Sequence, residues 1–369
     1  MIEVQSAGTK NLGWKIGALV IIKVIGALFA TLIFSRFSPL IDSKLYISGY
    51  YAIDPLLRTQ IIHKLAITLN AIGGAFFAHV AFGVISTMGL IYYFATGGRR
   101  WIFILMLLLP SSLVWTSIVS KEALYFGCFT LLLVIWSKYV VEKLNLADLL
   151  AAMIALSICG LLRPHYGVAI VWLFSATYLM KTLGSRAWCL MLALMAAAVV
   201  AIYFFAWTDI LYRGFGAIDD SARSSRYELF GIIPHLDEGV QGFHRFKQFV
   251  PLGIVAGIVG PLPSELLARP EFLPFFLEGL FVLLSPIFIY RYAAKQEFSG
   301  KILFFRIYWW CLVPALLSLM ILHAPFGLLN PGSATRWRTN FETLFYMAPL
   351  LLLFRFTDRN CHEDSTFSS

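Results

Sequence analysis

The sequence consists largely of long apolar segments, and this feature restricts its fold more than any other. The first segment runs from Trp14 to Phe34, and its only charged residues are Lys15 and Lys23. A helix needs about 20 consecutive, mostly apolar residues to cross the hydrocarbon core of a bilayer. We find about ten segments that approach this requirement, at 14–34, 65–95, 101–118, 122–140, 147–162, 166–180, 187–208, 273–290, 303–323 and 341–355.

The composition excludes the soluble classes of protein. Hydrophobic residues make up 59% and charged residues 13% of the 369 residues, against roughly 45–50% and about 25% in a soluble domain. A soluble globule of this length could not be covered by so few polar side chains. Because the apolar runs are continuous and not alternating, they indicate helices and not barrel strands. We therefore expect an all-α polytopic membrane protein of about ten transmembrane helices.

The charge and the cysteines exclude further classes. A net charge of +9 fits basic residues that flank membrane helices and meet anionic lipid better than it fits a nucleic-acid interface. The five cysteines form no CxxC pair and no Cys/His cluster, so neither a disulfide framework nor a zinc site is indicated. Motifs for nucleotide phosphates, dinucleotides, serine hydrolases and zinc proteases are also absent from the sequence.

The basic residues predict an orientation in the membrane. With the N-terminus in the cytoplasm, each short inner linker carries at least two Lys or Arg, as the positive-inside rule requires. This orientation predicts one membrane domain over 1–358 and a disordered cytoplasmic tail at 359–369. The domain has two long outer, periplasmic loops at 35–64 and 209–272, which we expect to contain short interfacial helices. Segment 250–263 is short and interrupted by Gly and Pro, so we interpret it as re-entrant or interfacial.

This orientation gathers the unexpected polar residues at the outer face. The first outer loop contributes carboxylates and tyrosines, two tight turns contribute basic groups, and the segment before the last span contributes a pair of arginines around a tryptophan. The candidate functional residues are Asp42, Tyr46, Lys121, Glu122, Arg163, His165, Arg336, Trp337 and Arg338. A simpler interpretation remains open for each: snorkelling arginines, interfacial aromatics, and an acid at a helix N-terminus.

Three short elements together resemble the GT-C class of multi-span membrane glycosyltransferases, and also the bacterial O-antigen and capsule polymerases. The first is Asp-Ser-x-x-Tyr in the first outer loop, and the second is Pro-x-x-x-x-Trp-x-Ser followed by Lys-Glu before a helix. The third is Gly-x-x-x-Arg-x-Arg before the last span. They occur here as Asp42, Ser43 and Tyr46; Pro110, Trp115, Ser117, Lys121 and Glu122; and Gly332, Arg336 and Arg338. The class often has further acids beside the first, which this chain lacks.

The resemblance implies transfer of a sugar from a polyprenyl phosphate or diphosphate at the outer face of a bacterial inner membrane. On that basis Asp42 is the candidate base or acceptor-orienting group, with His165 as a second possible base. Lys121, Arg163, Arg336 and Arg338 are candidates for the leaving phosphate. Glu122 would orient Lys121, and Tyr46 and Trp337 would stack on sugar rings.

The resemblance requires no metal ion, because arginines can neutralise a phosphate, although Asp42 with Asp54 could hold a divalent cation. The implied partners are a polyprenyl-linked sugar or oligosaccharide, membrane lipid and other polysaccharide-assembly proteins of the membrane. Two other functions remain open from the sequence: a transporter or flippase of lipid-linked oligosaccharide or small molecules, and a non-catalytic scaffold. A transporter would have ionisable residues deep in its spans, and Lys23, His79, Glu278, Arg306 and His323 are the candidates.

Overall fold

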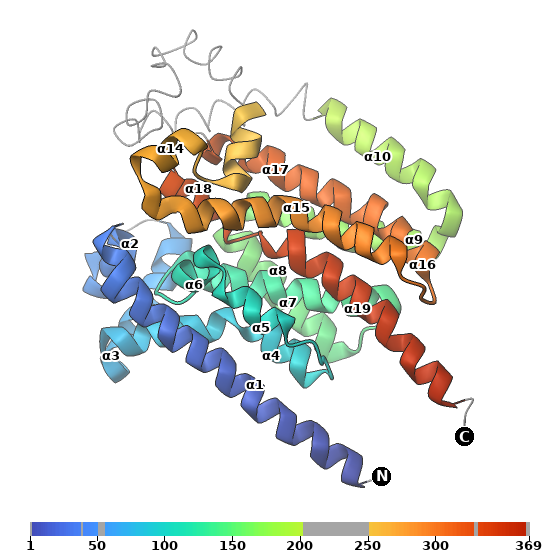
Figure 1. Ribbon diagram of the computed structural model, residues 1–369, viewed down its shortest axis with the longest axis horizontal. Coiled ribbons are helices and arrows are strands. Elements are labelled where there is room, and N and C mark those ends of the chain that lie inside the picture. The colour runs from blue at the N-terminus through green and yellow to red at the C-terminus, as the bar shows by residue number, and fades with distance from the viewer. Residues whose placement is uncertain (1, 38–39, 51–55, 202–250, 328–330, 367–369) are drawn as a thin grey trace. The chain divides into compact units, whose positions relative to one another are not determined.

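The computed structural model describes residues 2–37, 40–50, 56–201, 251–327 and 331–366 (Figure 1). All the regular elements in these ranges are helices, which confirms the predicted all-α class. The chain divides into two compact units. The first comprises Met1–Gly167 with Thr339–Thr343, and the second comprises Val168–Arg338 with Leu344–Ser369.

The first unit is built around α7 (Lys121–Val141), which packs against three other helices, α3 (Leu57–Ser86), α4 (Met88–Ala95) and α8 (Leu146–Leu162). A helix that is apolar on all sides is expected to be buried. In α7, 72% of an apolar stretch of 18 residues is buried. Both α1 (Ile2–Leu28) and α2 (Ile41–Ser48) pack on α3. The shorter elements of this unit are η1 (Phe29–Ile33), η2 (Phe34–Arg36), α5 (Ile102–Leu105), η4 (Met106–Leu108) and α6 (Pro110–Trp115).

Segment 101–118, predicted as one membrane span, is instead broken into α5, η4, α6 and an irregular stretch. The residue before a proline is driven out of the helical region, and Leu109, which precedes Pro110, has ψ 134°. After α6, serine and threonine side chains compete with the helix for backbone groups. Ser120 Oγ, for example, donates to the carbonyl of Trp115 at 2.8 Å. The hydropathy of segment 101–118 does not indicate where its helix is interrupted.

The second unit contains the later helices of the chain. They are α9 (Pro164–Leu183, in this unit from Val168), η5 (Gly184–Arg186), α10 (Ala187–Ala201), α14 (Pro263–Ala268), η8 (Pro270–Phe272), α15 (Leu273–Lys295), α16 (Lys301–Ile307), η9 (Tyr308–Leu312), α17 (Val313–Gly327), α18 (Pro331–Arg338) and α19 (Thr343–Thr366). Residues 251–259 form a further helix, and Gly260 follows it with φ 85°. A glycine in this left-handed conformation is the usual way to end a helix.

Glycines let the helix at 251–259 approach its neighbours closely. A Cβ atom on Gly279 of α15 would lie 2.0 Å from the carbonyl oxygen of Val259. A Cβ atom on Gly327 of α17 would lie 2.3 Å from the carbonyl oxygen of Gly253. Small residues at such crossings are typical of helices that pack in a membrane. The pair Gly253 and Gly257, four residues apart, matches this pattern.

Within the described ranges, 6 helices are long and apolar enough to cross a membrane. They are Leu12–Arg36, Leu57–Ser86, Lys121–Val141, Pro164–Leu183, Pro270–Lys295 and Lys301–Ala324, and α8 is a shorter apolar helix. The chain thus has the helices of a multi-pass membrane protein, but the described residues do not support the ten spans that we expected.

Several predicted boundaries also differ from the structure. The predicted outer loop 35–64 contains the short helix α2, but its last residues already belong to α3, which begins earlier than the predicted second span. The predicted span 187–208 begins as α10 and continues into residues 202–208, which lie outside the described part, as does most of the loop predicted at 209–272. At the C-terminus α19 continues to Thr366, so it includes residues 359–366, for which we predicted disorder.

Candidate functional site

Lys121 and Glu122 stand at the start of α7, where the local sequence places them. Ser120 has extended backbone, with φ −160°, and its Oγ accepts a hydrogen bond from the amide of Ala123 at 3.0 Å. A serine in this position satisfies an amide that would otherwise be unpaired at the helix start. The carboxylate of Glu122 then lies in the first turn, near the positive end of the helix dipole. The helix start therefore presents a cation and an anion in adjacent positions.

Glu122 forms a buried ion pair with Arg163. Arg163 Nη2 lies 2.8 Å from Glu122 Oε1, and the two side chains are 16% and 0% exposed. The backbone fixes Arg163 as well, because its amide donates to the carbonyl of Cys159 at 2.9 Å where α8 ends. Removing one partner of a buried ion pair leaves an uncompensated charge, which is costly. Glu122 and Arg163 are therefore held in place as a unit.

Lys121 is positioned by α2 and α3. Its Nζ donates to Thr59 Oγ1 at 2.9 Å and lies 5.8 Å from the centre of the Tyr46 ring. A cation within about 6 Å of an aromatic centroid is attracted to the face of the ring. Tyr46 is buried, and its carbonyl lies 3.0 Å from His63 Nδ1. The lysine thus has an aromatic neighbour and a hydroxyl neighbour, and both come from the predicted outer loop.

Further charged groups surround these residues. Asp42, in the first turn of α2, attracts the ammonium group of Lys121. Arg58, in the first turn of α3, repels it. Arg58 and Arg163 both disfavour a positive charge on His165, the second residue of α9. We use the name charge cluster for the set Asp42, Tyr46, Arg58, Thr59, Lys121, Glu122, Arg163 and His165. Its cations Arg58, Lys121 and Arg163 outnumber its carboxylates Asp42 and Glu122.

The structure brings together most of the residues that the sequence singled out. Asp42, Tyr46, Lys121, Glu122, Arg163 and His165 all belong to the charge cluster. Arg58 and Thr59 were not among the predicted site residues, because the predicted second span begins at residue 65, whereas α3 begins at Leu57. Buried Thr59, Ile62, His63 and Ala66 follow helical spacing, so this periodicity was the signal that could have extended the helix.

The two remaining phosphate candidates and Trp337 lie on α18 of the second unit. Arg336 and Trp337 are partly exposed there, whereas Arg338 is fully buried. Arg338 Nη2 pairs with Glu278 Oε2 at 2.6 Å, and Nη1 donates to the carbonyls of Ile258 at 2.7 Å and Val259 at 3.2 Å. The guanidinium is thus held by a carboxylate and by the carbonyl end of the helix at 251–259.

This burial changes the interpretation of Arg338. We expected it to bind a leaving phosphate, but its guanidinium is enclosed by protein groups within its own unit. A cation at a helix C-terminus is favoured by the helix dipole and by unpaired carbonyls. We therefore assign Arg338 to the packing of the second unit. Arg336 and Trp337 remain predictions for substrate binding.

The first unit also contains a buried series of hydrogen-bonded polar residues. Lys23 of α1 donates to Thr116 Oγ1, and Thr116 in turn donates to the carbonyl of Ser112. Ser112 Oγ donates to Glu342 Oε1 at 2.6 Å. All four residues are fully buried, and Lys23 lies near the middle of the candidate span Leu12–Arg36. Ionisable residues inside a membrane usually have a partner and often a function, and here Lys23 and Glu342 bracket two hydroxyl side chains.

No group of three or more His, Cys, Asp and Glu residues that could hold a metal ion occurs in the part of the chain that the structure describes. The suggested cation partner of Asp42, Asp54, lies outside that part. No protein-family model, curated protein or solved structure matches this chain.

Proposed function

We propose that this protein is a membrane glycosyltransferase or a polysaccharide polymerase. It would transfer a sugar from a polyprenyl-phosphate or polyprenyl-diphosphate carrier to an acceptor during assembly of O-antigen, capsule or exopolysaccharide. The single observation that carries the proposal is the charge cluster. It combines a carboxylate, several cations and an aromatic ring from four helices of one unit.

Each part of the proposed reaction has a matching group in the cluster. Asp42 accepts the proton of the acceptor hydroxyl as its oxygen attacks the anomeric carbon. The bond from that carbon to the carrier phosphate breaks, and the phosphate leaves with the electron pair. Lys121 and Arg163 stabilise the negative charge that develops on it, and Glu122 fixes Arg163. The buried ring of Tyr46 lies beside Lys121 and helps to hold its ammonium group in place.

The proposed location is the bacterial inner membrane, with the N-terminus and C-terminus in the cytoplasm and the charge cluster at the outer face. The positive-inside rule supports this orientation, because Arg99 and Arg100 precede α5 and the hairpin between α15 and α16 carries Lys295 and Lys301. A donor with a polyprenyl tail must remain in the bilayer. A reaction site at the end of membrane helices is suited to such a donor.

The variant Asp42→Asn tests the proposal in the native host. Without the carboxylate, sugar transfer is expected to fall by about 10²–10⁴-fold, the usual contribution of a general base. The measurement is the ladder of surface polysaccharide on a gel, at matched membrane expression. Lys44→Gln is the control, because Lys44 is an exposed residue of the same helix, and it is expected to give a normal ladder.

The pattern of the loss distinguishes the two transferase activities. Collapse of the ladder to one repeat unit, with accumulation of the lipid-linked unit, indicates a polymerase. A repeat unit that is shorter by one sugar indicates a monosaccharide transferase. A normal ladder from Asp42→Asn at normal expression contradicts the role of Asp42 and weakens the proposed function.

A second candidate function, transport of a lipid-linked oligosaccharide or a small molecule, is favoured by one observation. Lys23 and Glu342 are linked through Thr116 and Ser112 inside the first unit. Buried ionisable residues in membrane helices line the ion and proton paths of many transporters. A transferase site at the charge cluster does not require such a path. The role of the residues from Lys23 to Glu342 therefore distinguishes the two functions.

A double-mutant cycle of Lys23→Met and Glu342→Gln tests this difference. If the pair only packs the first unit, each single variant lowers thermal stability, the two couple by about 0.5–3 kcal/mol, and sugar transfer per folded protein is retained. If the pair serves transport, the variants stay folded while the precursor remains on the inner side of the membrane. The measurements are thermal unfolding in detergent and accessibility of the lipid-linked precursor to an added glycosidase.

A further inference from the structure

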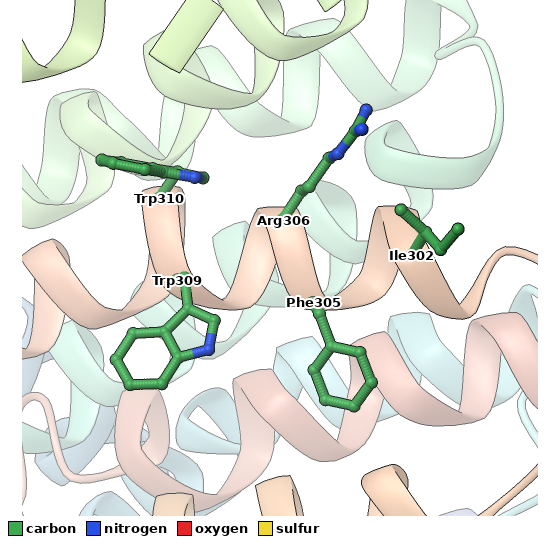
Figure 2. Close-up of a pocket in the computed structure, with 5 residues that line it drawn as sticks. All are labelled: Ile302, Phe305, Arg306, Trp309 and Trp310. Carbon is green, nitrogen blue, oxygen red and sulfur yellow. The ribbon is translucent and has the colours of Figure 1, made fainter. Parts of the chain in front are cut away.

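The second unit has an open pocket along α16 and η9. None of the residues that line it belongs to the charge cluster. The pocket has a volume of about 530 Å³ and is lined by Ile302, Phe305, Arg306, Trp309 and Trp310 (Figure 2). This volume lies in the range of about 300–1,000 Å³ that small-molecule sites occupy. The lining combines apolar and aromatic side chains with a single cation, Arg306.

The helix is locally distorted where it carries the two tryptophans. Tyr308–Leu312 is π-helical, and such segments are rare and occur frequently at functional sites. Trp172 Nε1 of α9 donates to the carbonyl of Trp310 at 3.3 Å, which helps to support the distorted turn. Figure 2 shows Arg306 and Trp310 projecting to one side of the helix, and Phe305 and Trp309 projecting to the other.

Arg306 is an exposed cation within a candidate membrane span, Lys301–Ala324. It makes no hydrogen bond or ion pair with the described residues, whereas Lys301, at the start of the same helix, pairs with Glu297 at 2.9 Å. A charge in or near the hydrocarbon region needs an opposite charge or access to the headgroup layer. The surroundings of Arg306 are therefore suited to an anion from the membrane itself.

The rest of the pocket is suited to the tail of the same molecule. Ile302 is 71% exposed and Trp309 is 51% exposed, so both present apolar surface outside the protein core. One exposed cation, Lys295, lies at the end of α15 on the same hairpin. Basic residues close to a membrane surface attract anionic lipid.

We propose that this pocket binds one anionic phospholipid. The phosphate accepts hydrogen bonds from the guanidinium of Arg306, and an acyl chain lies against Trp310 on the same side of the helix. A neutral phospholipid offers the same tail without the net charge, so the site selects by charge. This inference does not depend on the proposed transferase function, because no residue of the charge cluster takes part.

Native mass spectrometry of the purified full chain tests the proposal. The protein is delipidated in detergent and mixed with equal amounts of phosphatidylglycerol and phosphatidylcholine, and the bound lipids are counted. We expect one retained phosphatidylglycerol in preference to phosphatidylcholine. Arg306→Ala is expected to weaken this binding by about 10- to 100-fold, the value of a charge-assisted hydrogen bond. Arg306→Lys should restore part of it.

Arg291→Ala is the matched control, because it removes an exposed arginine of the same hairpin that does not line the pocket. It is expected to retain the bound phosphatidylglycerol. Equal loss in both alanine variants would mean that diffuse charge holds the lipid, and would overturn the assignment to the pocket. Unchanged binding by Arg306→Ala would also overturn it. So would a preference for undecaprenyl phosphate over phosphatidylglycerol in a third mixture.

Discussion

Arg163→Met is expected to lower sugar transfer by about 10²–10³-fold, the usual loss when one electrostatic group is removed from an active site. The same change should destabilise the first unit by about 3–5 kcal/mol. Both effects have one origin. Glu122 is fully buried 2.8 Å from the guanidinium. Removal of Arg163 therefore leaves the carboxylate uncompensated and, in the proposed reaction, deprives the leaving phosphate of a cation.

The double variant Glu122→Gln with Arg163→Met separates these two effects. Replacing both members of a buried ion pair by neutral residues is often neutral or stabilising, whereas removing one is costly. The double variant is therefore expected to recover most of the lost stability. Transfer should remain low, because no guanidinium is present to bind the phosphate. Recovery of transfer together with stability would show that the pair has a structural role only.

The matched control is a second ion pair at the other end of α7. Lys138 Nζ lies 2.8 Å from Asp148 Oδ2, and their side chains are 15% and 2% exposed. These exposures resemble those of Arg163 and Glu122, but neither residue belongs to the charge cluster. Lys138→Met should therefore lower stability while transfer per folded protein is retained. The measurements are thermal unfolding in detergent and transfer from a polyprenyl-linked donor, normalised to folded protein.

The charge cluster shows what a sequence of this kind can predict. Continuous apolar segments predict a helical membrane protein, and the structure confirms helices of that length. Alternation of the spans then predicts that Asp42, Lys121 and Arg163 share one face, although they lie far apart in the chain. Two residues that the sequence did not indicate, Arg58 and Thr59, are in the first turn of a helix that begins with polar residues. A hydropathy window does not mark such a start.

Other features depend on contacts that no local pattern contains. Arg336 and Arg338 belong to one short element and look equivalent in the sequence, yet only Arg338 is fully buried. Its partner Glu278 is 60 residues away and appeared in the sequence only as an isolated acid inside a span. The segment at 101–118 was also predicted wrongly as one span. Its hydropathy is sufficient, but Pro110 and the hydroxyl side chains after it interrupt the helix.

Arg338→Met is the second change with a large expected effect, and it acts on the second unit alone. Glu278 would lose its partner in a pair whose two side chains are both 0% exposed, which is expected to cost about 3–5 kcal/mol. Unfolding of this unit can be followed with a thiol-reactive dye, because Cys311 is buried within it. Cys128, Cys159, Cys189 and Cys361 are first replaced by alanine, so that Cys311 alone gives the signal.

The double variant Arg338→Met with Glu278→Leu separates two parts of the lost stability. One comes from the unpaired carboxylate, and the other comes from the lost hydrogen bonds of Arg338. Without both charges, the unit should recover the cost of the unpaired carboxylate. It should not recover completely, since the carbonyls of Ile258 and Val259 lose the donor that Arg338 provides. Each buried acceptor left unpaired costs about 1–3 kcal/mol, so we expect the double variant to remain less stable than the parent. Complete recovery would mean that the arginine only neutralises Glu278 and does not hold the end of the helix at 251–259.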